Sequence, residues 1–157
     1  MLDSYDDAGV FLGVLDTIFM VCYAIGLYVS GWLGERMELR KLVTAGTVST
    51  AITLMLFGYV LPMMNCKSMT VWAVVWGLNG FAQSTGWPSL VTIMSNWFGV
   101  ESRGLVLGCW SACASVGNIM GALMVNQFLP YGFQYSFMWV SFTLLILSGL
   151  TLTIDLI

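Results

Sequence analysis

The sequence predicts an all-α membrane protein with about five transmembrane helices, and three observations carry this prediction. Of the 157 residues, 59% are hydrophobic and 8% are charged, and the mean hydropathy is +0.88. Soluble domains carry about 25% charged residues, so these charges could not cover the surface of a soluble fold of this size. The apolar residues form continuous runs long enough to cross a bilayer, unlike the alternating pattern of a membrane β-barrel.

Five apolar runs are separated by short connections. Because the connections are short, consecutive helices are expected to be antiparallel neighbours. The first run follows Asp3, Asp6 and Asp7 and is too long for a signal peptide, so it is interpreted as a true span. The expected spans cover about 8–33, 42–64, 70–98, 104–128 and 135–157.

The basic residues of the connections predict an orientation. The first connection contains Arg36, Arg40 and Lys41 and the third contains Arg103, whereas the second contains only Lys67 and the fourth has no basic residue. Cytosolic loops are enriched in Lys and Arg. The first and third connections are therefore expected in the cytosol, with the N-terminus lumenal or extracellular and the C-terminus cytosolic.

The composition excludes several function classes. The chain has no histidine, which removes Ser–His–Asp and Cys–His catalysis and histidine-ligated metals. Five basic residues are too few for a nucleic-acid interface. We expect no enzyme activity, no metal, no cofactor and no nucleic-acid partner. The lipid bilayer is the expected environment.

The third span contains a polar run within its apolar sequence. Asn79 and Gln83 are four residues apart and share a helix face, which Trp87 continues. Pro88 has no N–H to donate to the carbonyl of Ser84, so a backbone acceptor is freed within the membrane. These residues line a substrate cavity in one interpretation, and in the other they join helices around a proline kink.

The fourth span carries a stripe of small and polar residues on one face. Such a stripe allows another helix to approach closely, and tight packing is the simpler interpretation. Ser111 and Asn118 are the candidates for a place beside a cavity. The second and fifth spans carry only Thr and Ser as polar residues, so they are expected to be peripheral. The stripe consists of Gly104, Gly108, Ser111, Ser115, Asn118 and Ala122.

Asp16 is a carboxylate well inside the first span. An isolated charge at the bilayer centre costs at least about 2.5 kcal/mol, so Asp16 is expected to face protein or water. It belongs to a proton relay in one interpretation and makes a structural hydrogen bond near the outer surface in the other.

The first connection carries a family resemblance. Gly31-Trp32-Leu33-Gly34-Glu35-Arg36 followed by Arg40-Lys41 resembles the loop between helices 2 and 3 of the major facilitator superfamily, with departures at Glu38 and Leu39. The resemblance implies a cytoplasmic gate in which a carboxylate and an arginine pair when the gate closes. The alternative is a basic loop that only sets the topology. The implied gating residues are Gly31, Glu35, Arg36 and Arg40.

A second set of residues resembles a narrower group, the organophosphate:phosphate antiporters. Within it, the chain is most similar to the eukaryotic sugar-phosphate exchangers, solute carrier family 37, and the run from Trp110 to Ser115 is most similar to one member of that family. The residues are Asn79-Gly80, Gln83-Ser84-Thr85-Gly86-Trp87-Pro88, Asn96-Trp97-Phe98-Gly99, Arg103-Gly104, Trp110 and Ser115-Val116-Gly117-Asn118-Ile119.

The resemblance implies a fold of twelve helices in two six-helix halves around a central cavity. Residues 1–157 would be an incomplete N-terminal half that contains helices 2 to 6. The implied function is exchange of an organic phosphate, such as a sugar phosphate, for inorganic phosphate. The implied location is the endoplasmic reticulum membrane, with the lysosome or plasma membrane as alternatives. Asn79, Gln83 and Trp87 would line the cavity, and Ser111 and Asn118 would lie beside it.

The resemblance also implies that the chain is inactive alone. The phosphate-binding arginines of the family lie on helices without a counterpart here, and no span interior contains Arg or Lys. The start at Met1, just ahead of the family's helix 2, suits an internal-start isoform or a truncated gene model. The alternative function is a non-transporting interaction module or regulatory short isoform that acts beside a membrane-protein partner.

Overall fold

The computed structural model describes residues 5–65, 68–99 and 102–153, and these residues are helical with short connections. No strand occurs among them, which confirms the predicted all-α class. The helices are α1 (Tyr5–Gly34), α2 (Leu39–Met55), the π-helical turn η1 (Leu56–Val60), α3 (Leu61–Met63), α4 (Met69–Gln83), α5 (Gly86–Trp97), α6 (Arg103–Phe128), the 3-10 turn η2 (Leu129–Tyr131) and α7 (Phe133–Thr153).

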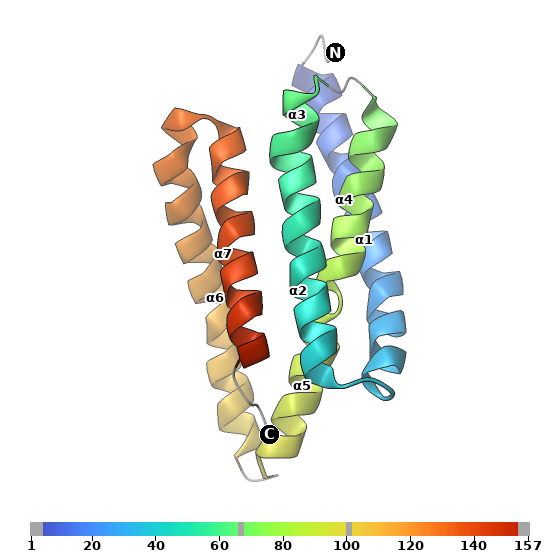
Figure 1. Cartoon of the computed structure of the whole chain (residues 1–157), viewed down its shortest axis with the longest axis vertical. Coiled ribbons are helices and arrows are strands. Elements are labelled where there is room, and N and C mark those ends of the chain that lie inside the picture. The colour runs from blue at the N-terminus through green and yellow to red at the C-terminus, as the bar shows by residue number, and fades with distance from the viewer. Residues whose placement is uncertain (1–4, 66–67, 100–101, 154–157) are drawn as a thin grey trace.

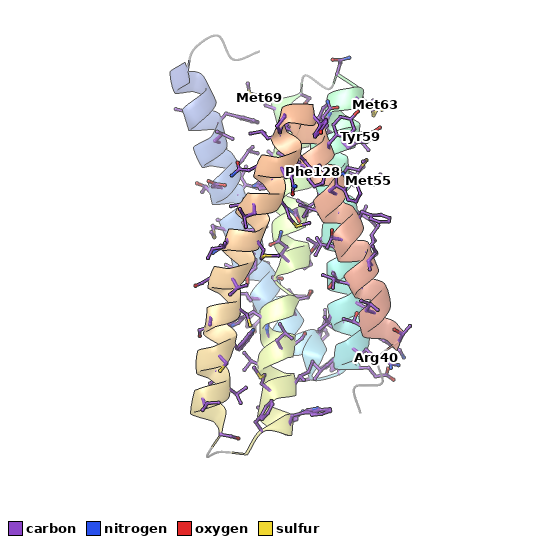
Figure 2. All side chains as sticks on the ribbon, turned by 90° about the vertical axis from the view of Figure 1, so that its left-hand side faces the viewer. Arg40, Met55, Tyr59, Met63, Met69 and Phe128 are labelled. Atoms are coloured by element: carbon purple, nitrogen blue, oxygen red, sulfur yellow. The ribbon has the colours of Figure 1, made fainter. Side chains whose placement is uncertain are left out.

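The helices run up and down along the long axis of the molecule (Figure 1). The connection between α1 and α2 lies at the same end as the junction of α5 and α6, and α3 and η2 lie at the other end. Arg40 is therefore far from Met63, Met69 and Phe128 (Figure 2). This alternation agrees with the antiparallel arrangement expected from the short connections.

Four stretches are continuous helix and apolar enough to cross a membrane. The predicted third span, 70–98, is instead a broken helix, in which α4 and α5 follow one another along the long axis (Figure 1). The break falls at Ser84 and Thr85, whose hydroxyls lie 2.7 and 3.0 Å from the carbonyl oxygens of Phe81 and Ala82. The four continuous stretches are Gly9–Gly34, Leu39–Met63, Gly104–Tyr131 and Phe133–Thr151.

Helices α1 and α4 pack closely because glycine lies where their backbones meet. A Cβ atom placed on Gly80 would lie 2.5 Å from the backbone oxygen of Phe19. Beside this contact, the ring of Phe19 packs on Trp76, and Trp76 packs on Phe57 of η1. The aromatic cluster thereby joins α1, α4 and the end of α2.

Helix α2 lies between α4 and α7 and is the most enclosed of the four continuous spans. The sequence-based expectation of a peripheral position is therefore not met for this span. Small residues explain the difference, since Gly46, Thr50 and Ala51 are buried and let the neighbouring helices approach. The threonine hydroxyls of α2 bond largely to its own backbone, so a central helix needs no amide side chain.

Helix α6 is the least covered helix of the described structure. None of its described side chains is buried, and nothing within the described residues lies within 4 Å of a Cβ placed on Gly104, Gly108, Gly117 or Gly121. The close packing expected for this stripe is thus not formed within the described part of the chain.

Candidate functional site

An open groove lies between α2, the junction of α4 and α5, and α7. Its volume is about 360 Å³, within the range of small-molecule sites. Its lining includes no charged side chain, and Gln83 is the one lining residue with a side-chain N–H. We call this feature the central groove, and it is lined by Gly46, Thr47, Thr50, Leu54, Ala82, Gln83, Thr85, Gly86, Val140 and Leu144.

Behind the groove, three polar side chains from two helices form a small network. Asn79 is fully buried, at 0% exposure. Its Oδ1 atom lies 3.2 Å from Thr53 Oγ1 on α2 and 3.3 Å from the Nε2 atom of Gln83. Asn79 Nδ2 has no hydrogen-bond partner. The network joins α2 to α4 and holds the exposed side chain of Gln83 from behind.

The break beside the groove is stabilised by a third helix. The Ser30 hydroxyl of α1 donates to the carbonyl oxygen of Ser84 at 3.2 Å, in a buried position. This is the acceptor that Pro88 cannot satisfy, so the freed carbonyl predicted from the sequence has a partner. Glycine allows the approach, because a Cβ on Gly26 would clash with the Ser84 side chain.

Trp87 lies on the other side of the break, is not one of the residues that line the central groove, and contacts α6. Its ring stacks on Trp110 with centroids 4.5 Å apart and planes 21° from parallel. Ser111 follows on α6 and its hydroxyl donates to the carbonyl oxygen of Leu107 at 2.9 Å. Asn118 is exposed two turns further along α6. The structure thus brings together Asn79 and Gln83, and separately Trp87 and α6.

The four gating residues predicted from the sequence cluster at the connection between α1 and α2. The guanidinium carbon of Arg36 lies 4.1 Å from the ring centroid of Trp32, in the range of a cation–π contact. Gly31 lies on the last turn of α1, Glu35 is exposed just after it, and Arg40 is the second residue of α2. Of the charges beside them, Glu38 and Lys41 form an exposed ion pair at 3.0 Å.

Asp16 lies on an exposed face of α1. Among the residues that the structure describes, no cation or hydrogen-bond donor contacts its carboxylate. Its neighbour Thr17 bonds back to the carbonyl of Gly13 at 2.8 Å. The structural hydrogen bond is not formed within the described part of the chain, and the proton relay stays a prediction.

The sequence interpretation missed the contribution of α2 to the site. Thr47 and Thr50 line the groove, and Thr53 belongs to the network behind it. A signal was present, because threonine recurs at Thr44, Thr47, Thr50 and Thr53, a spacing of three that keeps successive side chains on neighbouring parts of the helix surface.

Comparison with known protein families gives one extensive match. The profile described as Major Facilitator Superfamily matches residues 1–155. No solved structure matches the chain with statistical significance.

Curated relatives resemble the chain over most of its length. "Sugar phosphate exchanger 3" of Xenopus laevis is 49% identical over 131 residues, which are 83% of this chain and 26% of that protein. The human protein of the same name is 44% identical over 138 residues, 88% of this chain and 28% of that protein. "Putative glycerol-3-phosphate transporter 1" of Arabidopsis thaliana is 43% identical over 131 residues, 83% of this chain and 25% of that protein. The chain thus spans about a quarter of the length of these relatives.

Proposed function

Since the chain belongs to the major facilitator superfamily, we propose that it is part of a secondary transporter that exchanges an organic phosphate, such as a sugar phosphate, for inorganic phosphate. The names of the relatives support this substrate class, and all of those named above are exchangers or transporters rather than enzymes. The observation that carries the proposal is the central groove, in which a neutral amide, Gln83, faces an open space between transmembrane helices.

In this proposal the chain is inactive alone. The groove lining offers hydrogen-bonding groups but no positive charge, and a phosphate dianion within a membrane needs charge compensation. The cations would come from helices outside these residues. Asn79, Gln83 and Trp87 would serve the cavity, Ser111 and Asn118 would lie beside it, and Gly31, Glu35, Arg36 and Arg40 would form the cytoplasmic gate.

Exchange in proteoliposomes tests the proposal. We expect vesicles that contain the full-length transporter to exchange labelled inorganic phosphate for sugar phosphate, and vesicles that contain this chain alone to show none. Gln83→Leu in the full-length protein should lower exchange about tenfold, as expected when one hydrogen bond to a charged group is lost, with expression retained. Unchanged kinetics would remove Gln83 from the site, and exchange by the short chain would contradict the need for outside cations.

The second candidate is a membrane interaction module, and the uncovered α6 favours it. This helix has small and polar residues on an exposed face and no buried side chain among those described. Such a face fits another helix closely. Cross-linking of the short chain to a full-length transporter, together with absence of exchange by the chain alone, would favour this function.

In the proposed orientation of the chain, the connection of α1 and α2 lies on the cytosolic side of the endoplasmic reticulum membrane. Met37→Cys and Ser68→Cys place thiols at exposed positions at opposite ends of the helices, in a background in which the four native cysteines are replaced. In sealed microsomes with the cytosolic face outward, we expect a membrane-impermeant maleimide to label Cys at position 37. Position 68 should react only after permeabilisation. The reverse pattern would invert the proposed topology.

A further inference from the structure

The hydroxyl of Thr53 has one proton and three acceptors within reach. The carbonyl oxygens of Ser49 and Thr50 lie 2.9 and 3.0 Å from Thr53 Oγ1, and the nearest atom of the Asn79 amide lies 3.2 Å away. A threonine inside a helix donates to the backbone carbonyl one turn earlier. The proton of Thr53 is therefore used within α2, and its oxygen presents lone pairs to Asn79.

An acceptor at Thr53 requires a donor at Asn79. The amide of Asn79 can be turned by 180° about its last bond, which exchanges oxygen and nitrogen without moving another residue. Both polar contacts of Asn79, to Thr53 and Gln83, involve the same amide position. An NH2 group there has two hydrogens, one for each contact. This rotation also moves Nδ2 away from the buried position in which it has no hydrogen-bond partner. A carbonyl oxygen takes that position, and a buried carbonyl without a partner is tolerated better than a buried N–H.

The orientation of Asn79 fixes that of Gln83. If Asn79 donates to Gln83, the Gln83 atom in contact must be Oε1, and Nε2 lies on the other branch of the amide. Because Gln83 is exposed on the groove lining, that branch is available to the groove. We propose that Thr53 and Asn79 hold the Gln83 amide with its Nε2 hydrogens toward the central groove, where they donate to a phosphoryl oxygen of the substrate.

The polarity of the lining bears on the ligand atom that Gln83 meets. The hydroxyls of Thr47 and Thr85 donate to the carbonyls of Val43 and Ala82 at 2.8 and 3.0 Å, so they present acceptors to the groove. Gln83 then provides two N–H donors, which bind an oxygen with free lone pairs. The assignment to a phosphoryl oxygen rests on the proposed transport of phosphate esters. In the opposite orientation, Gln83 would accept from a sugar hydroxyl instead.

Thr53 is a positioning residue in this arrangement, because it acts on the substrate only through Asn79 and Gln83. Thr53→Val keeps the shape of the side chain but removes the acceptor that selects the Asn79 orientation. Thr53→Ser retains that acceptor. Thr92 on α5 is a matched control, since its hydroxyl also bonds back one turn, to Pro88 at 2.9 Å, and it contributes neither to the groove nor to the network.

Gln83→Glu in the full-length transporter tests the polarity directly. A glutamate oxygen still accepts from Asn79, so the thermal midpoint of the purified protein should match the wild type. The two donors toward the groove are lost and a carboxylate faces the phosphate, so the KM for inorganic phosphate should rise at least about tenfold. The unchanged thermal midpoint is the readout that identifies the orientation. A thermal midpoint lowered as much as by Gln83→Leu would show that the amide nitrogen contacts Asn79 and the oxygen faces the groove, and would overturn the proposal.

The threonine variants test the positioning role. We expect Thr53→Val to raise the KM for inorganic phosphate several-fold with little change in the maximal rate per folded transporter, Thr53→Ser to restore it, and Thr92→Val to leave it unchanged. Equal effects of the two valine variants would overturn the role of Thr53.

Failure of the proposed function would be recognised separately. If the wild type exchanges neither phosphate nor sugar phosphate, the transport proposal is wrong, and stability then decides the amide orientation. Gln83→Leu removes the acceptor for Asn79 and should lower the thermal midpoint, whereas Gln83→Glu should not. If Glu destabilises as much as Leu, the inferred orientation is wrong as well.

Discussion

Gly80→Ala is expected to destabilise the protein by about 3 kcal/mol, near the upper end of the usual range for overpacking. The added Cβ would lie 2.5 Å from the backbone oxygen of Phe19. A backbone atom in the middle of a long helix cannot turn aside as a side chain would. Helices α1 and α4 must therefore separate, and the contact of Phe19 with Trp76 weakens with them.

The measurement is the apparent thermal midpoint of the purified full-length transporter in detergent, followed by the monodisperse fraction that survives heating. Gly13→Ala on α1 is the matched control, since nothing within the described residues lies within 4 Å of a Cβ at that position. Alanine also has the better helix propensity, by about 1 kcal/mol, so the control should be neutral or stabilising. Equal midpoints for the two variants would mean that the close approach at Gly80 does not contribute to stability.

Composition and periodicity predict the class of this fold well because the bilayer constrains it strongly. Apolar runs longer than about 20 residues must be helices in lipid, and short connections make neighbouring helices antiparallel. The broken third span was harder to predict. The sequence showed Pro88 and the freed carbonyl, but the break lies at Ser84 and Thr85, where hydroxyls compete for backbone carbonyls, and the Ser30 partner is 54 residues away.

The site was predicted only in part, for a related reason. Asn79 and Gln83 were proposed from the sequence because amides within an apolar run are conspicuous. Thr53 was not, because threonine hydroxyls ordinarily bond to their own backbone and do so here as well. Thr53 affects Asn79 because its hydroxyl oxygen can still accept a hydrogen bond after its proton is used within α2. This contact becomes visible only in the structure, where α2 and α4 lie side by side. The exposed face of α6 likewise has no partner within the described residues that would decide between packing and cavity lining.

Ser30→Ala and Pro88→Ala are expected to be coupled, although the residues belong to different helices. The Ser30 hydroxyl lies 3.2 Å from two carbonyl oxygens, those of Leu27 and Ser84. Leu27 lies inside α1 and has a helical N–H partner, whereas Pro88 provides no N–H for Ser84. Loss of the hydroxyl therefore leaves the buried Ser84 carbonyl without a donor. Ser30→Ala alone should cost about 1–3 kcal/mol.

In the Pro88→Ala background, the restored N–H at position 88 can donate to the Ser84 carbonyl one helical turn earlier. Ser30→Ala should then cost less, and the double-mutant cycle should give a coupling free energy of about 1 kcal/mol or more. The measurement is the stability of the four proteins in the same detergent, and Ser49→Ala on the exposed face of α2 controls for removal of a serine hydroxyl. Strict additivity would mean that Ser30 stabilises the protein through some other contact, and that the break between α4 and α5 does not depend on α1 for its missing hydrogen bond.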